Sequence, residues 1–202
     1  LLVSRSEDEV RARAADVTAA GGTAKAYGCD LADPVAVDRL VKRIREECGD
    51  RLDALVNLAG GFGSSGPIAE SDPATIDRMF AINVKTAYLT TRAFFPLLRV
   101  ARGSIVFFAS EIVVEGSRSA GVSAYAAAKS AVVALMRSVA DEGRDGGIRA
   151  NALAPASIRT ATNEASMGDK VRYVEPEDVP PIVTFLTSPA ARAITGQVIR
   201  LR

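Results

Sequence analysis

The chain of 202 residues contains no histidine and only two cysteines, Cys29 and Cys48, which stand apart from each other without a Cys-x-x-Cys spacing. Without histidine, the chain itself can hold no Ser-His-Asp triad, no Cys-His pair and no His-ligated metal site. Isolated cysteines favour a reducing, cytoplasmic location over secretion. The chemistry must therefore use tyrosine, lysine, carboxylates or a bound cofactor.

The chain also lacks an excess of charge and a long apolar run. It has 25 basic and 24 acidic residues, a net charge of +1, and basic residues that are scattered along the sequence. This distribution gives no footprint for nucleic acid or for an anionic membrane. No apolar run approaches the ~20 residues that a membrane-spanning helix needs. With 48% hydrophobic residues, the chain has enough apolar material for the core of one α/β domain.

Short apolar runs of strand type alternate with helical stretches, which predicts a parallel sheet covered by helices on both faces. The expected strands are 1–4, 23–27, 52–56, 105–109, 148–153 and 197–201. The expected helices are 7–20, 34–47, 73–95, the segment from Tyr125 to about 142, and 177–186. Two prolines at 180–181 predict that the last helix is kinked or starts one turn later. No linker or repeat interrupts this order, so we expect one domain over 1–202.

Tyr125 and Lys129 form the most informative pair in the chain. A spacing of four places both side chains on one face of a helix. A free phenol titrates near ~10, and a nearby ammonium lowers that pKa toward neutrality, where acid–base catalysis is efficient. The spacing alone is also common on exposed helices, where it carries no chemistry.

Other residues strengthen the catalytic interpretation. Ser110 ends an expected strand before the Tyr125 helix, Asn83 lies in an expected helix, and the run 57–60 reads Asn-Leu-Ala-Gly. Together with Tyr125 and Lys129, this ordered set resembles the short-chain dehydrogenase/reductase family over essentially the whole chain. The resemblance implies a doubly wound, three-layer Rossmann fold with strand order 3-2-1-4-5-6-7. It also implies an NAD(P) cofactor, a small carbonyl or alcohol substrate, and a homodimer or homotetramer.

By this resemblance, Tyr125 is the general acid and base, and Lys129 lowers its pKa and binds the nicotinamide ribose. Ser110 orients the substrate oxygen, and Asn83 holds a water that links Lys129 to solvent. The alternative for Asn83 is an asparagine inside a helix that makes only local hydrogen bonds to the backbone. The alternative for Ser110 is a hydroxyl at the end of a strand without a role in the chemistry. The Ser110–Tyr125 spacing is about two residues longer than is common in the family, which the loop 115–121 could absorb.

The resemblance also assigns residues to the cofactor. Asp30, followed by Leu31, would meet the adenine, although a turn aspartate is the alternative. The remaining expected contacts, besides Tyr125 and Lys129, are Asn57, Ala59 and Gly60 around the adenosine ribose, and Pro155, Ile158 and Thr160 near the nicotinamide. Ala156 stands where the family has glycine after proline, so the local path of that loop is expected to differ.

Ser4-Arg5 at the exit of the first strand bears on the choice of cofactor. A hydroxyl and a guanidinium suit a ribose 2′-phosphate, whereas an acidic residue there would select NAD. We therefore expect NADP. An arginine that only stacks on adenine leaves NAD as the alternative.

The family's first strand and its glycine-rich phosphate turn have no counterpart before Leu1, so we expect an upstream segment that carries them. The run 61–66 matches Gly-x-Gly-x-x-Gly, but Pro67 follows it and no helix begins within it. We interpret this run as a flexible loop beside the nicotinamide ribose rather than as a pyrophosphate cradle.

The leading functional prediction is an NADP-dependent reductase of a ketone or aldehyde, reversible as an alcohol dehydrogenase. The alternative is a cofactor-sensing or structural relative without turnover. The stretch 161–174, at the family's variable substrate region, is short and polar and identifies no substrate.

Overall fold

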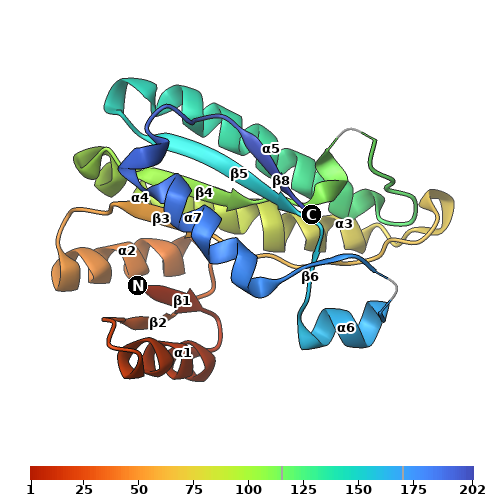
Figure 1. Cartoon of the computed structure of the whole chain (residues 1–202), viewed down its shortest axis with the longest axis horizontal. Helices are drawn as coiled ribbons and strands as arrows, with labels where there is room; N and C mark the ends of the chain where they lie inside the picture. The colour runs from red at the N-terminus through yellow and green to blue at the C-terminus, as the bar shows by residue number, and fades with distance from the viewer. Residues whose placement is uncertain (115, 170) are drawn as a thin grey trace.

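The computed structural model describes residues 1–114, 116–169 and 171–202, and parallel strands with flanking helices form its centre (Figure 1). Four parallel strands pair in the order β3-β4-β5-β8. Two further parallel strands, β1 and β2, pair with each other. The strands of these two sheets are β1 (Leu2–Ser4), β2 (Ala26–Gly28), β3 (Ala54–Asn57), β4 (Ser104–Phe108), β5 (Arg149–Pro155) and β8 (Val198–Leu201).

The helices connect these strands in the alternating order that the sequence predicts. They are α1 (Glu7–Ala19), α2 (Pro34–Cys48), α3 (Ala74–Met79), α4 (Thr86–Ala101), α5 (Ser123–Glu142), α6 (Ala161–Met167) and α7 (Val179–Thr187). Asp33 caps α2 by accepting a hydrogen bond from the Val35 N–H, and Pro34 occupies the first position. Helix α7 starts two residues later than expected, so that Pro180 and Pro181 fall in its first turn, where proline is tolerated.

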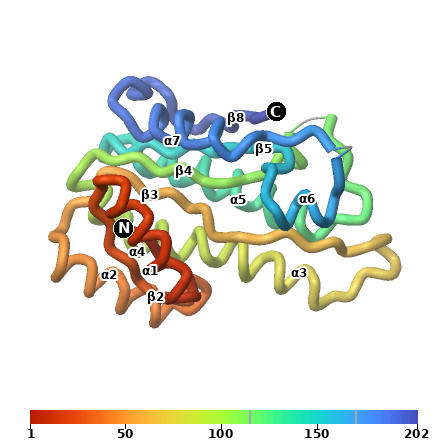
Figure 2. The backbone as a smooth tube through the Cα atoms, turned by 60° about the horizontal axis from the view of Figure 1, so that its bottom comes forward, coloured from red at the N-terminus to blue at the C-terminus, as the bar shows by residue number. Residues whose placement is uncertain are grey.

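The helices lie on both faces of the four-stranded sheet, because alternate side chains of each strand point to opposite sides. Ile105 and Phe107 of β4 belong to the core under α2, α4 and α5, whereas Val106 belongs to the cluster under α7. All three side chains are fully buried. Figure 2 shows α7 and β8 together on one side and α4 on the other. The expected three-layer α/β architecture is therefore correct.

The observed strand order agrees with the expected one, with a break between β1 and β3. Within the described residues, no strand pairs with both β1 and β3. Val56 on β3 is 40% exposed, whereas Val106 at its paired position on β4 is 0% exposed.

Two segments differ from the sequence prediction. The expected helix 73–95 is longer and is divided by a π-helical segment, η2 (Phe80–Lys85), between α3 and α4. The stretch 157–174 holds structure that the sequence analysis left undefined: β6 (Ser157–Ile158) pairs in parallel with β7 (Tyr173–Val174) around α6. Arg159 joins this unit through ion pairs to Glu164 and Glu175.

Candidate active site

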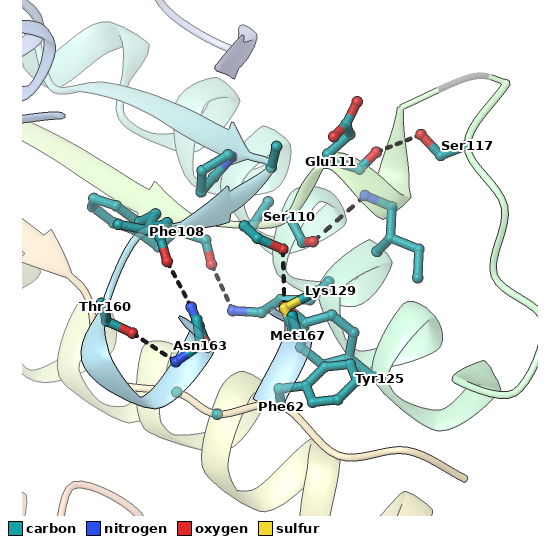
Figure 3. A pocket seen from close by; sticks show the side chains of 18 of the residues that line it. Phe62, Phe108, Ser110, Glu111, Ser117, Tyr125, Lys129, Thr160, Asn163 and Met167 are labelled. Carbon is teal, nitrogen blue, oxygen red and sulfur yellow. Dashed lines mark hydrogen bonds between the residues drawn. The ribbon is translucent and has the colours of Figure 1, made fainter. Parts of the chain in front are cut away.

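A cavity of about 900 Å³ opens at the carboxyl ends of β4 and β5 (Figure 3). Loops from the ends of parallel strands meet at this edge, where α/β sheets bind ligands. Of the residues predicted for the site, the cavity is lined by Gly60, Ser110, Tyr125, Lys129, Pro155, Ile158 and Thr160. The fold therefore brings together predicted site residues that are up to 100 positions apart in the chain.

Helix α5 carries both members of the predicted catalytic pair. Lys129 is 7% exposed, its Nζ donates a hydrogen bond to the Phe108 carbonyl at 2.9 Å, and it lies 5.8 Å from the centre of the Tyr125 ring. An ammonium has three N–H donors. The Phe108 carbonyl is the one acceptor for them among the described residues, so Lys129 retains donor capacity at the cavity wall.

Burial dominates the protonation of this pair. It lowers the pKa of Lys129 to about 8. Burial also raises the pKa of Tyr125 above its usual value, and a hydrogen bond with Ser110 opposes that shift. The net shift of the Tyr125 pKa is upward because desolvation of the phenol outweighs the effect of Ser110. The expected lowering of this pKa by Lys129 stays a prediction.

Ser110 lies between the end of β4 and the cavity, as predicted. Its Oγ accepts the Ile112 N–H at 3.5 Å, which caps the short helix η3 (Glu111–Val113), and the nearby hydroxyl favours the ionised form of the Tyr125 phenol. Both residues line the same cavity. Of the loop expected to absorb the longer spacing to Tyr125, residue 115 lies outside the described residues.

Asn83 does not line the cavity but fixes the loop that does. It sits in the π-helical segment η2 and is 1% exposed. Its Nδ2 donates to the carbonyls of Gly61 and Met79, each at 3.0 Å, and its Oδ1 accepts the Gly61 N–H at 3.1 Å. These bonds agree with the alternative of an asparagine bonded to the backbone. The water-holding role of Asn83 stays a prediction.

The three residues expected around the adenosine ribose are not equivalent in the structure. Asn57 is buried and bonded to α4: its Nδ2 donates to Thr91 Oγ1 at 2.9 Å, and its Oδ1 accepts the Thr90 hydroxyl at 2.7 Å. Its side chain therefore holds β3 against α4, and the expected contact of this residue with the adenosine ribose stays a prediction. Ala59 is exposed beside Gly60, and Leu58 lines the cavity instead of Asn57.

The residues expected at the adenine end lie beyond the cavity, at the carboxyl ends of β1 and β2. Arg5 is exposed, and Ser4 Oγ accepts the Ser6 N–H at 3.3 Å. Asp30 Oδ1 accepts the Ala32 N–H at 2.9 Å, which agrees with the alternative of a turn aspartate. Leu31 packs against the main core. None of these four residues lines the cavity.

Several side chains of the cavity were not predicted from the sequence. Phe62 packs edge-on against Tyr125, with ring centres 5.1 Å apart (Figure 3). It belongs to the 61–66 run, which is a loop, as predicted. The next α-helix along the chain is α3. Glu111, Arg118 and Arg200 add charge to the lining, and Asn163 and Met167 of α6 add further side chains. Only the spatial arrangement of the strands could identify Arg200 as part of this site.

A nicotinamide cofactor fits the residues on the Lys129 side of the cavity. The donor capacity of Lys129 suits ribose hydroxyl acceptors. A Cβ on Gly60 would lie 2.6 Å from Asn83 Oδ1 and 3.4 Å from Lys129 Nζ, so only glycine leaves this wall open. Within the described residues, no cluster of three or more potential metal ligands is present. No described helix combines the length and hydrophobicity needed to cross a bilayer.

Comparisons with known proteins extend over nearly the whole chain. A family model described as enoyl-(acyl carrier protein) reductase matches residues 1–201. A tropinone reductase homolog of Arabidopsis thaliana is 34% identical over 182 residues, which are 85% of this chain and 68% of that protein. A short-chain type dehydrogenase/reductase from Mycobacterium ulcerans has a similar structure, with a TM-score of 0.90, 28% identity, and coverage of 99% of this chain and 78% of that one. The NADP-bound structure of ElxO gives a TM-score of 0.88 and 25% identity, covering 98% of this chain and 84% of that one.

Proposed function

This chain belongs to the short-chain dehydrogenase/reductase family, whose members are NAD(P)-dependent oxidoreductases acting on CH–OH and C=O groups, and we propose that it reduces a ketone or aldehyde with NADPH, reversibly. One observation carries the proposal. Ser110, Tyr125 and the buried Lys129 line one cavity, and the Ser110 hydroxyl lies near enough to the phenol to oppose the upward shift of the Tyr125 pKa. Two hydroxyls in one cavity can supply the orientation and the proton that a carbonyl oxygen needs.

The residues then have distinct roles. Bound nicotinamide cofactor supplies the hydride in reduction and accepts it in oxidation. Tyr125 donates its phenolic proton to the carbonyl oxygen, and takes a proton from the alcohol in the reverse direction. Ser110 orients that oxygen, Lys129 holds the ribose and keeps a positive charge beside the phenol, and Asn83 fixes Gly61 at the cavity wall.

We propose NADP rather than NAD as the preferred cofactor. Arg5 is exposed at the carboxyl end of β1, where a ribose 2′-phosphate would meet a guanidinium. The carboxylate of Glu7, two residues further along the chain, forms an ion pair with Arg11 at 2.6 Å within α1. The existence of an NADP-bound structural relative supports this choice. A cofactor-sensing relative without turnover is the second candidate, and the intact Ser110, Tyr125 and Lys129 argue against it.

Association into a cytoplasmic homodimer or homotetramer is part of the proposal. A mainly apolar groove of about 400 Å³ lies where η2 and α4 face α5, and is lined by Phe80, Val84, Tyr88 and Leu135, with Asp77 and Lys85 also in its lining. Phe80 and Tyr88 are 37% and 53% exposed. A self-complementary two-fold contact would cover these side chains.

Variants of the catalytic pair test the reaction in the full-length protein. NADPH oxidation is followed at 340 nm with a panel of ketones and aldehydes. Tyr125→Phe should lower kcat/KM by at least ~100-fold without changing NADPH affinity, since it removes only the proton donor. Lys129→Ala should lose both rate and NADPH affinity, and Lys129→Arg should recover part of the rate.

The exposed Tyr88 supplies a matched control, because Tyr88→Phe removes a phenolic hydroxyl outside the cavity. It should retain wild-type turnover. Near-normal turnover by Tyr125→Phe would refute the proposed chemistry, and binding of NADPH with no turnover of any carbonyl would favour the cofactor-sensing alternative.

A further inference from the structure

Two arginines of the last strand share one carboxylate at the edge of the cavity. Glu111 directly follows Ser110, and its Oε1 accepts hydrogen bonds from Arg200 Nη2 and from Arg202 Nε, the latter at 3.0 Å. Arg200 and Glu111 line the cavity, and each side chain is 27% exposed. Arg202, at 53% exposed, contacts the same carboxylate from outside the lining.

Arg200 has donors that the described residues do not use. A guanidinium carries five N–H donors. Arg200 Nε is buried and has no hydrogen-bond acceptor within the part of the chain that the structure describes. A buried donor without an acceptor destabilises a protein, so an oxygen of a water or of a ligand beside Arg200 would be stabilising.

The charges of the cavity lining also favour an anionic ligand. The ionisable side chains that line it, besides Tyr125, are Glu111, Arg118, Lys129 and Arg200. Glu111 is already shared between two guanidiniums, which leaves the cavity with an excess of positive charge. Because low-dielectric walls strengthen this field, an anionic group is favoured inside the cavity over a neutral one.

The sheet order separates Arg200 from the position expected for the 2′-phosphate of the cofactor. Arg200 lies on β8, paired with Ala154 of β5, at the end of the four-stranded sheet opposite β3. Arg5, where the 2′-phosphate is expected, follows β1 in the other sheet (Figure 1). An anion beside Arg200 would therefore come from the substrate.

We propose that the substrate carries an anionic group, a carboxylate or an equivalent oxyanion, which Arg200 and Arg118 bind while Ser110 and Tyr125 hold the reacting oxygen. This proposal rests on the proposed reductase function and narrows it to oxo acids or hydroxy acids. Arg200 is then a specificity-determining residue, since a planar guanidinium binds a carboxylate through two parallel hydrogen bonds.

Matched substrate pairs test the proposal. The full-length protein is assayed at saturating NADPH with 2-oxo, 3-oxo and 4-oxo acids and with their methyl esters. The wild type should have a kcat/KM at least ~10-fold higher for the best acid than for its ester. Arg200→Met should lower kcat/KM for the acid by about 10- to 100-fold and change that of the ester by less than about two-fold, as expected for one charge-assisted contact.

Arg202→Gln is the control, because it perturbs the same carboxylate without changing a cavity-lining side chain, and it should keep the wild-type preference. NADPH affinity, measured by fluorescence, should be unchanged in Arg200→Met; a loss there would assign the site to the cofactor and overturn the proposal. An equal loss of activity on acid and ester, or a wild-type preference for esters, would also overturn it.

Equilibrium binding separates this proposal from the reductase function. If no carbonyl is reduced, the same acids are titrated in the presence of NADP by calorimetry. Binding of an acid that Arg200→Met weakens by at least ~10-fold would support the anion site while the reductase function fails. Equal binding by the wild type and Arg200→Met would refute the anion site.

Discussion

Because the ammonium of Lys129 is buried, the free energy of unfolding should depend on pH, and replacing Lys129 should remove this part of the dependence. Its pKa falls from an ordinary value of 10.5 to about 8 because the folded protein desolvates it. Between these two values the unfolded chain holds a proton that the folded protein has released, so the free energy of unfolding rises with pH over this window. At about 1.4 kcal/mol per pH unit, the rise amounts to about 3 kcal/mol.

Lys129→Met isolates this contribution. Urea denaturation, followed by circular dichroism between pH 7 and pH 10.5, gives the free energy of unfolding of each protein. The difference between wild type and Lys129→Met should be constant below pH 8 and should then increase by about 3 kcal/mol in favour of the wild type. Subtracting the variant removes the titration of all other groups that the two proteins share.

Lys42 on α2 provides the control, since it is exposed. Lys42→Met should change stability by less than ~0.5 kcal/mol at every pH. The reasoning fails if the difference between wild type and Lys129→Met does not change between pH 8 and pH 10.5, or if Lys42→Met reproduces the change.

Three further results are expected. Gly60→Ala should lower the free energy of unfolding, measured by urea denaturation, by about 1–3 kcal/mol and should weaken NADPH binding, because its Cβ would lie 2.6 Å from Asn83 Oδ1 and break the bonds to Gly61. Gly146→Ala is the control and should be tolerated, since its Cβ would meet Arg99 at 3.5 Å. NADPH affinity, measured by fluorescence, should fall about ten-fold between pH 7 and pH 9 as Lys129 passes through its pKa of about 8, and Lys129→Ala should remove that dependence. Light scattering at micromolar concentration should give a dimer or tetramer, and Tyr88→Arg should favour the monomer because it puts charge into the groove between α4 and α5.

The sequence could predict what local patterns encode. The positions of Tyr125, Lys129 and Ser110 were correct because strand ends and helix faces follow from hydrophobic periodicity and from capping. The break of the long helix at η2 could not be predicted, since the segment has no proline or glycine to mark it. The short helix α6 was missed because seven residues carry too little periodicity, although Thr160 caps it by accepting the Asn163 N–H.

The surroundings of some site residues depend on contacts between distant elements. Asn57 was expected at a ribose, but Thr90 and Thr91 of α4, 33 and 34 positions away, satisfy its amide. Arg200 was missed because β5 brings the end of β8 beside the cavity only in three dimensions. In both cases sheet order and helix packing determine whether a polar side chain faces the protein or a ligand.

The pKa shifts of Tyr125 and Lys129 show why spacing alone does not make a catalytic pair. Lys129 releases its proton near pH 8, before Tyr125, whose pKa burial raises from its ordinary value near 10. An uncharged amine cannot stabilise a phenolate, so the lysine has no effect on the tyrosine in the pH range where the tyrosine ionises. Hydroxyl acceptors at Lys129 Nζ, such as those of a nicotinamide ribose, would favour the ammonium and raise its pKa. A retained charge 5.8 Å from the ring is worth about 3 kcal/mol at an effective dielectric constant near 20. This energy would offset the burial of the phenolate, which makes activation of Tyr125 depend on occupancy of the cofactor site.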